Sequence, residues 1–205
     1  MKTIIQIVLT IVILALAFLL YRSIQNPIEF NKAREERYEA AIEKLKDIRK
    51  AQVAFKSVHG IFANNFDTLE SFLHNDSFKI ERVEGRIPDS LDLAEALKAN
   101  IVELVPTKVS VKDSIFSDHY AIDSIKYVPY TNGKIFEMGA GKVMTGSKVE
   151  VDVFEVKVSN NVLLNGLDEQ LITNWNDEWE TITGYAGLKV GSLTETTNNA
   201  GNWDY

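Results

Sequence analysis

The residues that could perform acid–base or metal chemistry are few and scattered in this 205-residue chain. The three histidines, His59, His74 and His119, lack the histidine or acidic neighbours at the spacings typical of zinc ligands. Cysteine is absent, which excludes disulfides, thiolate metal sites and a cysteine nucleophile. We therefore expect the histidines at the surface or at junctions between elements.

Carboxylates are the remaining candidates for chemistry. An acidic group near the C-terminus could supply oxygen ligands to calcium, but its spacing does not match the loop of a calcium-binding hand. A solvated acidic face explains the same residues. A catalytic carboxylate pair would be distant in sequence and would leave no local motif. The sequence thus predicts no enzyme and no cofactor, with calcium left open; the acidic group comprises Asp168, Glu169, Asp177, Glu178 and Glu180.

A glycine-rich segment, "GAGKVMTGSK" at 139–148, superficially resembles a phosphate-binding loop. The order of its Gly, Lys and Ser/Thr residues differs from that motif, and the segment lies between expected strands rather than before a helix. We expect it to connect two strands of a hairpin.

The charge distribution argues against nucleic acid as a partner. The net charge is −7, and residues 57–205 hold 12 basic and 23 acidic side chains. This acidity could attract a cation or a basic protein surface. An acidic surface that keeps the domain soluble explains it more simply.

An apolar run at 3–21, "TIIQIVLTIVILALAFLLY", predicts a membrane-spanning helix. At about 1.5 Å per residue it would be roughly 28 Å long, close to the hydrocarbon thickness of a bilayer. Gln6 and Thr10 are the only polar interruptions, and Lys2 and Arg22 flank it. The expected anchor residues are Ile4, Ile5, Ile7, Val8, Leu9, Ile11, Val12, Ile13, Leu14, Leu16, Phe18, Leu19 and Leu20.

A cleaved signal peptide is the competing interpretation, because Ala15 and Ala17 form a small-x-small pair. Cleavage there would cut within the apolar run, so a retained anchor is favoured. We expect the N-terminus in the cytoplasm and the remainder outside the cytoplasmic membrane.

An amphipathic helix is expected to follow, starting near Pro27 and ending at Val58, with Gly60 as its C-terminal cap. Apolar residues recur at spacings of three and four along it. The stripe could form a coiled coil, but it is short for one, so packing on the protein's own sheet is favoured. The expected packing residues are Tyr38, Ala41, Leu45, Ile48 and Phe55.

The distal half predicts two short helices before a β-rich region. The first follows Asn65 or Asp67, either of which can cap it, and a strand is expected at 78–83. The second helix is expected at 89–100, capped by Asp89 or Ser90.

Strands dominate the expected structure after residue 107. "KVSVK" at 108–112 alternates, and Asn132-Gly133 between two apolar runs predicts a hairpin. The buried face switches at Phe154 in "KVEVDVFEVKV", which indicates either a bulge or a strand that changes its buried side.

The C-terminal part carries the tryptophans. Residues 167–182 predict a short acidic helix or loop in which Trp175 and Trp179 can share a face, and the polar segment 196–205 is expected to fray. Trp175, Trp179 and Trp203 are candidate interface residues because aromatic side chains are enriched at interface cores. The alternative is that the first two belong to the core of their own domain.

The architecture resembles type IV pilins and the pseudopilins of secretion systems. The resemblance rests on the apolar helix, its amphipathic continuation and "AQVAFKSVHGIFANNFDTLESFL" at 51–73, followed by strands. It implies a junction between helix and head at Gly60, Phe62 and Leu69. The processing-site glycine and the early glutamate of pilins have no counterpart here, because no glycine precedes Gly60 and no acidic residue precedes Glu29. Standard prepilin processing is therefore not expected.

These observations predict an α+β, pilin-like fold in which an N-terminal transmembrane helix continues into a long amphipathic helix packed on an antiparallel β-sheet. The expected divisions are an anchor at 1–22, a stalk at 23–60, a head at 61–195 and a flexible tail at 196–205. The expected function is structural: a single-pass subunit of a cell-envelope assembly that contacts the membrane, its own copies or other envelope proteins. The alternative is a membrane-tethered module that binds a ligand or calcium.

Overall fold

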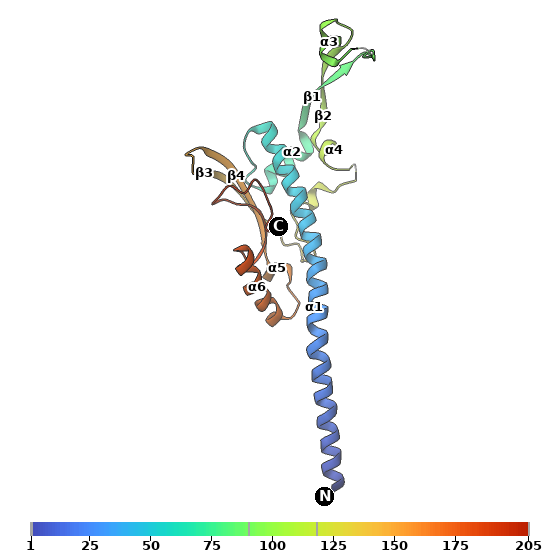
Figure 1. Ribbon diagram of the computed structural model, residues 1–205, viewed down its shortest axis with the longest axis vertical. Helices are drawn as coiled ribbons and strands as arrows, with labels where there is room; N and C mark the ends of the chain where they lie inside the picture. Colours follow the sequence, from blue (N-terminus) through green and yellow to red (C-terminus); the bar gives the residue numbers. More distant parts are fainter. Residues whose placement is uncertain (1, 90, 118, 205) are drawn as a thin grey trace.

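The computed structural model describes residues 2–89, 91–117 and 119–204 and consists of one long helix with a head on its C-terminal half (Figure 1). Helix α1 spans Lys2–His59, 58 residues, or about 87 Å at 1.5 Å per residue. Its N-terminal end stands free of the head, and a hairpin arm projects from the opposite end of the molecule (Figure 1). The chain is α+β with antiparallel sheets, as expected.

Helix α1 is continuous from the apolar run into the head. The expected helix start near Pro27 is wrong, because this residue lies inside α1. Proline lacks the N–H that would bond to the carbonyl four residues earlier, so one intrahelical hydrogen bond is missing there. The helix ends at His59, where Gly60 adopts a φ of 78° and its N–H donates to the Lys56 carbonyl at 2.8 Å.

The C-terminal half of α1 forms the central element of the hydrophobic core. Its first buried side chain is Phe30, and all five expected packing residues are buried. They face the protein's own head, so the apolar stripe is not a coiled-coil seam. The helix packs against β5 (Gly187–Gly191), α2 (Phe66–Asn75) and α4 (Val111–Ile115).

Helix α2 lies across the end of α1 and begins where the sequence indicates. Of the two expected caps, Asn65 fills the position, since its side chain accepts from the Thr68 N–H at 2.8 Å. The Phe72 ring meets the Phe55 ring edge to face, with centroids 5.1 Å apart. Leu69, on the same helix, is fully buried.

The main sheet is antiparallel, with the order β3-β4-β5. Strand β3 spans Glu137–Met144 and β4 spans Glu150–Ser159. Their register runs without a break, so the bulge considered at Phe154 is wrong. Instead, the strand changes its buried side there, because Val153 and Phe154 are both buried on opposite faces.

The arm contains β1 (Ser77–Glu84), α3 (Leu93–Lys98) and β2 (Glu103–Ser110), with α3 at its tip (Figure 1). The helix expected at 89–100 is shorter, and its cap is Asp92, which forms a capping box with Glu95. The expected cap Asp89 is therefore wrong, and Ser90 lies outside the described residues. The strand expected at 108–112 is the end of β2, which stops at Ser110, and α4 (Val111–Ile115) begins at the next residue.

The hairpin expected around Asn132-Gly133 is reduced to one β-bridge between Tyr127 and Ile135. The intervening loop includes Pro129, which has no N–H to extend the ladder. A short 3-10 helix, η1 (Ile122–Ser124), precedes this loop.

Helices α5 (Asn160–Leu163) and α6 (Glu169–Thr183) connect β4 to β5. Asp168 caps α6, because its carboxylate accepts from the N–H groups of Gln170 and Leu171. The acidic segment is therefore a helix, the first of the two forms expected from its sequence.

The C-terminal segment differs from the expected frayed tail. Gly201 forms a β-bridge with Val190, and the Asn202 N–H donates to the Lys189 carbonyl at 3.0 Å, so the segment covers the outer edge of β5. The Asp204 carboxylate lies 2.8 Å from Arg49 of α1. The Gly201 N–H and then this guanidinium lower the pKa of the Asp204 carboxyl.

Candidate functional site

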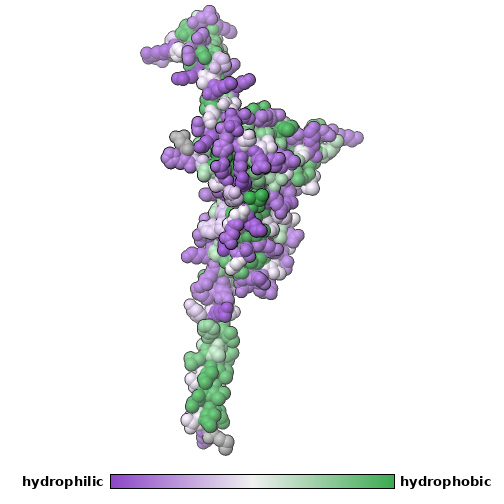
Figure 2. Space-filling view, turned by 180° about the vertical axis from the view of Figure 1, so that it is seen from behind, coloured by the Kyte–Doolittle hydropathy of each residue, from purple (hydrophilic) through white to green (hydrophobic). Residues whose placement is uncertain are grey.

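The first candidate site is the bare apolar end of α1, which forms an apolar shaft below the polar head in Figure 2. Its large side chains have exposed fractions between 45% for Val12 and 66% for Leu20. This helix is the only one among the described residues that is long and apolar enough to cross a membrane. All the expected anchor residues lie on it: Ile4, Ile5, Ile7, Val8, Leu9, Ile11, Val12, Ile13, Leu14, Leu16, Phe18, Leu19 and Leu20.

The second is a buried polar network where α1 enters the head. The Tyr38 hydroxyl donates to Oδ1 of Asn160, at the start of α5, and accepts from Nε1 of Trp175 on α6 at 2.8 Å. Burial raises the pKa of Tyr38 to about 12, so the hydroxyl keeps its proton at neutral pH. Helix α1 is joined at this one oxygen to α5 and α6, which lie more than 120 residues later in the chain.

The tryptophans expected at an interface pack mainly on their own head. Trp175 and Trp179 stack with centroids 5.2 Å apart, and both rings meet Tyr38 edge to face. The Arg34 guanidinium lies over the Trp175 ring, 3.9 Å from its centroid. Trp203 is partly buried against the same core. Trp175 and Trp179 therefore belong to the core of their own head, which is the alternative to an interface role. Trp203 also packs against that core.

Gln52 is a second polar residue on the buried face of α1, with an exposed fraction of 0%. Its side-chain amide donates to the Ala63 carbonyl at 2.8 Å and its Oε1 accepts from the Ala63 N–H at 2.9 Å. This pair of bonds holds the chain that leaves α1. The expected junction residues lie around it: Gly60 ends α1, while Phe62 and Leu69 are buried on either side of Ala63 in sequence.

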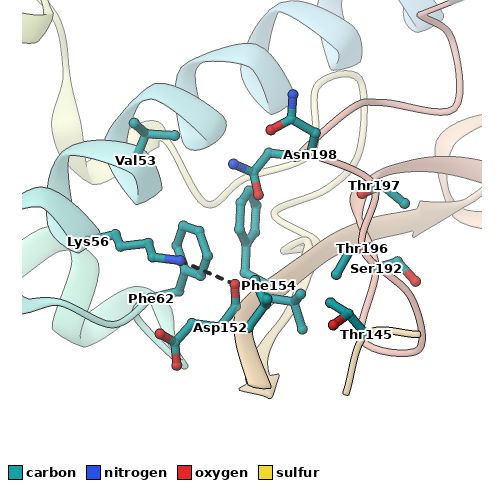
Figure 3. Close-up of a pocket in the computed structure, with 13 residues that line it drawn as sticks. Val53, Lys56, Phe62, Thr145, Asp152, Phe154, Ser192, Thr196, Thr197 and Asn198 are labelled. Carbon is teal, nitrogen blue, oxygen red and sulfur yellow. Dashed lines mark hydrogen bonds between the residues drawn. The ribbon is translucent and has the colours of Figure 1, made fainter. Parts of the chain in front are cut away.

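A cleft of about 410 Å³ lies between the end of α1, strand β4 and the C-terminal segment (Figure 3). The Lys56 ammonium lies 4.4 Å from the Phe62 ring centroid and donates to the Asp152 carbonyl at 3.3 Å. Hydroxyl and amide side chains of 196–199 form the opposite wall. The cleft combines hydrogen-bonding groups, the Lys56 ammonium and the Asp152 carboxylate with a mainly apolar surface, which suits a small molecule with both polar and apolar parts.

Two of the histidines form separate pairs with aspartates rather than one cluster. His59 lies 3.1 Å from Asp76, and His74 lies 2.9 Å from Asp123, in two separate partly exposed pairs. Within 2–89, 91–117 and 119–204, no group of three or more His, Asp or Glu residues is placed to hold a metal ion. Asp168, one of the possible calcium ligands, is used as a helix cap.

No family model, curated protein or solved structure matches this chain.

Proposed function

We propose that the chain is a single-pass, membrane-anchored structural subunit of a cell-envelope assembly. Residues 3–21 span the cytoplasmic membrane, and the head stands on its outer side. The pilin-like arrangement of anchor, stalk helix and head supports a building block rather than a catalyst.

One observation carries this proposal: α1 is a single helix whose first 28 residues make no part of the core. A buried Leu or Ile side chain gains about 1.5–3 kcal/mol over an exposed one, so a long apolar shaft in water is unfavourable. A bilayer supplies the missing burial. The apolar run of α1, residues 3–21, is roughly 28 Å long, close to the thickness of the hydrocarbon layer.

The head favours contacts with proteins over contacts with nucleic acid. It is acidic, and an arm of two strands projects from the end opposite the anchor (Figure 1). A two-stranded ribbon presents open edges on both sides and is only marginally stable alone. The arm therefore suits contact with another envelope protein or another copy of the chain.

The proposal predicts that the protein resists extraction from membranes by alkaline carbonate and is released by detergent. Its intact mass should include residues 2–22, and protease added to spheroplasts should digest the head. A chain found in the soluble fraction, or one whose mass begins after Ala17, would contradict the proposal. The control is a variant with Leu9, Ile13 and Leu16 all changed to Lys, which should no longer remain in the membrane fraction.

The cleft beside Lys56 supports a second candidate function, a membrane-tethered binding module. Lys56 forms no ion pair with a carboxylate among the described residues, which leaves its charge free for a ligand. Thermal-shift titration of the full chain with acidic sugars and short peptides would test it. The expected result is a stabilisation that Lys56→Met abolishes. An equal shift in both chains would count against the cleft.

A further inference from the structure

We propose that the anchor helix self-associates as a parallel dimer through one face that contains Gln6. This inference rests on the proposed function, because it requires residues 3–21 to lie in a bilayer. The partner is a second copy of this chain, oriented the same way in the same membrane.

Gln6 supplies the specific contact. Its carboxamide carries both donors and an acceptor, and within the described residues it forms no side-chain hydrogen bond. The Thr10 hydroxyl, in contrast, is satisfied by the Gln6 main-chain carbonyl at 2.9 Å. Hydrocarbon offers no hydrogen bonds, so an unpaired amide there is costly. A second copy of the chain removes this cost, since the Gln6 amide of each copy can donate a hydrogen bond to the Gln6 side-chain oxygen of the other.

The residues around Gln6 have the spacing of a helix–helix seam. Thr3, Thr10, Ala17 and Ile24 recur every seventh residue, which places them in one line along a supercoiled helix. The first three are small, and small side chains let helix backbones approach closely in a membrane. Thr3, Gln6 and Thr10 also line a shallow groove of about 270 Å³ on the helix surface.

The intervening seam positions are Gln6, Ile13 and Leu20, which alternate with the small residues at spacings of three and four. The seam then passes beyond the apolar run to Ile24, which is 64% exposed although it lies on the water side of Arg22. An exposed isoleucine there is explained if it packs against its copy. The head begins only at Phe30, so it leaves the whole seam free.

A parallel arrangement follows from this geometry. In a two-fold parallel pair, equal positions meet at equal depth, so Gln6 faces Gln6 of the second copy. A polar residue at a single seam position fixes the register of a helix pair, because any shift would leave both amides unpaired.

The absence of cysteine allows a clean test by disulfide cross-linking of the full chain in liposomes. Ala17→Cys places a thiol on the seam. Ala15→Cys is the matched control, because two residues turn the helix by about 200° and move it by only about 3 Å along the axis. After oxidation, Ala17→Cys should give at least about tenfold more dimer than Ala15→Cys, given this opposed placement. Equal cross-linking of the two variants would overturn the proposal.

A second measurement isolates the amide. Resonance energy transfer between labelled chains, recorded as lipid is added, gives the dimer dissociation constant. Gln6→Leu should raise that constant about 3- to 30-fold, the range for interhelical polar contacts in membranes. Val8→Leu, off the seam, should leave it unchanged. An unchanged constant in Gln6→Leu would overturn the role of Gln6.

Flotation of the same liposomes tests membrane insertion separately from dimerisation. Protein that fails to float would overturn both the proposed function and the dimer. Protein that floats but shows no seam-selective cross-linking would overturn the dimer alone.

Discussion

Replacing Tyr38 by Ala should lower the free energy of unfolding by about 3–5 kcal/mol, the usual loss for a large buried aromatic residue. The ring is buried between α1 and α6, and its hydroxyl joins Asn160 to Trp175. Truncation would leave a cavity and two polar groups without their partner, the buried Asn160 Oδ1 and the partly buried Trp175 Nε1. Urea unfolding of the full chain in detergent, followed by tryptophan fluorescence, measures the change directly.

Tyr38→Phe is the matched control, because it keeps the ring and removes only the hydroxyl. We expect a loss of about 1–3 kcal/mol, the cost of leaving buried polar groups unpaired. The pKa of Tyr38 is raised from 10.0 to about 12, so folding favours the neutral phenol. The hydroxyl's contribution is therefore complete below pH 10 and is lost as the pH rises towards 12. The difference between the native chain and Tyr38→Phe should narrow over that range, and a constant difference would contradict the assigned role.

Replacing Gln52 by Leu should cost about 2–6 kcal/mol, since the N–H and C=O of Ala63 would each lose a partner at about 1–3 kcal/mol. Leu has a similar size and is apolar, so a simple hydrophobic stripe would be stabilised by the same change. A loss of stability on Gln52→Leu would therefore indicate that Gln52 acts through its hydrogen bonds, and a gain would indicate simple hydrophobic packing. Urea unfolding of the full chain in detergent is again the measurement.

Gln52→Glu adds a test based on pH. A carboxylate can accept from the Ala63 N–H but would repel the Ala63 carbonyl, whereas the protonated acid can serve both groups. Burial raises the pKa of the introduced carboxyl above about 4.3, its ordinary value. Its cost relative to the native chain should therefore be smallest below pH 4.3 and grow by up to about 1.4 kcal/mol per pH unit above it. A cost that does not vary with pH would contradict the paired hydrogen bonds.

Local patterns were sufficient to predict the long helix and its end. Apolar residues spaced by three and four along α1 indicate which side of the helix is buried. Gly60, which follows the last helical residue, indicates where the helix ends. Asn65 at the start of α2 is a signal of the same kind, because the cap bonds within its own turn. Pro27 misled the prediction, since a long helix tolerates one missing hydrogen bond.

Contacts between distant segments could not be predicted. The Tyr38 network joins residues more than 120 positions apart, and no local spacing records such a contact. Gln52 offered a partial signal, because a polar residue on an apolar stripe must find a buried partner. The C-terminal segment is polar enough to fray, yet it pairs its backbone with β5, which composition does not reveal.

Because α1 continues from the apolar run into the head, a rotation of the helix in the membrane also rotates the head. Each residue of an α-helix turns it by about 100° and advances it by about 1.5 Å. A single residue inserted between Ser23 and Phe30 would therefore swing the head about a quarter turn while barely raising it. Seven inserted residues would restore the bearing to within about 20° and lift the head by roughly 10 Å. The length of this segment sets both the direction in which the head faces and its height above the bilayer.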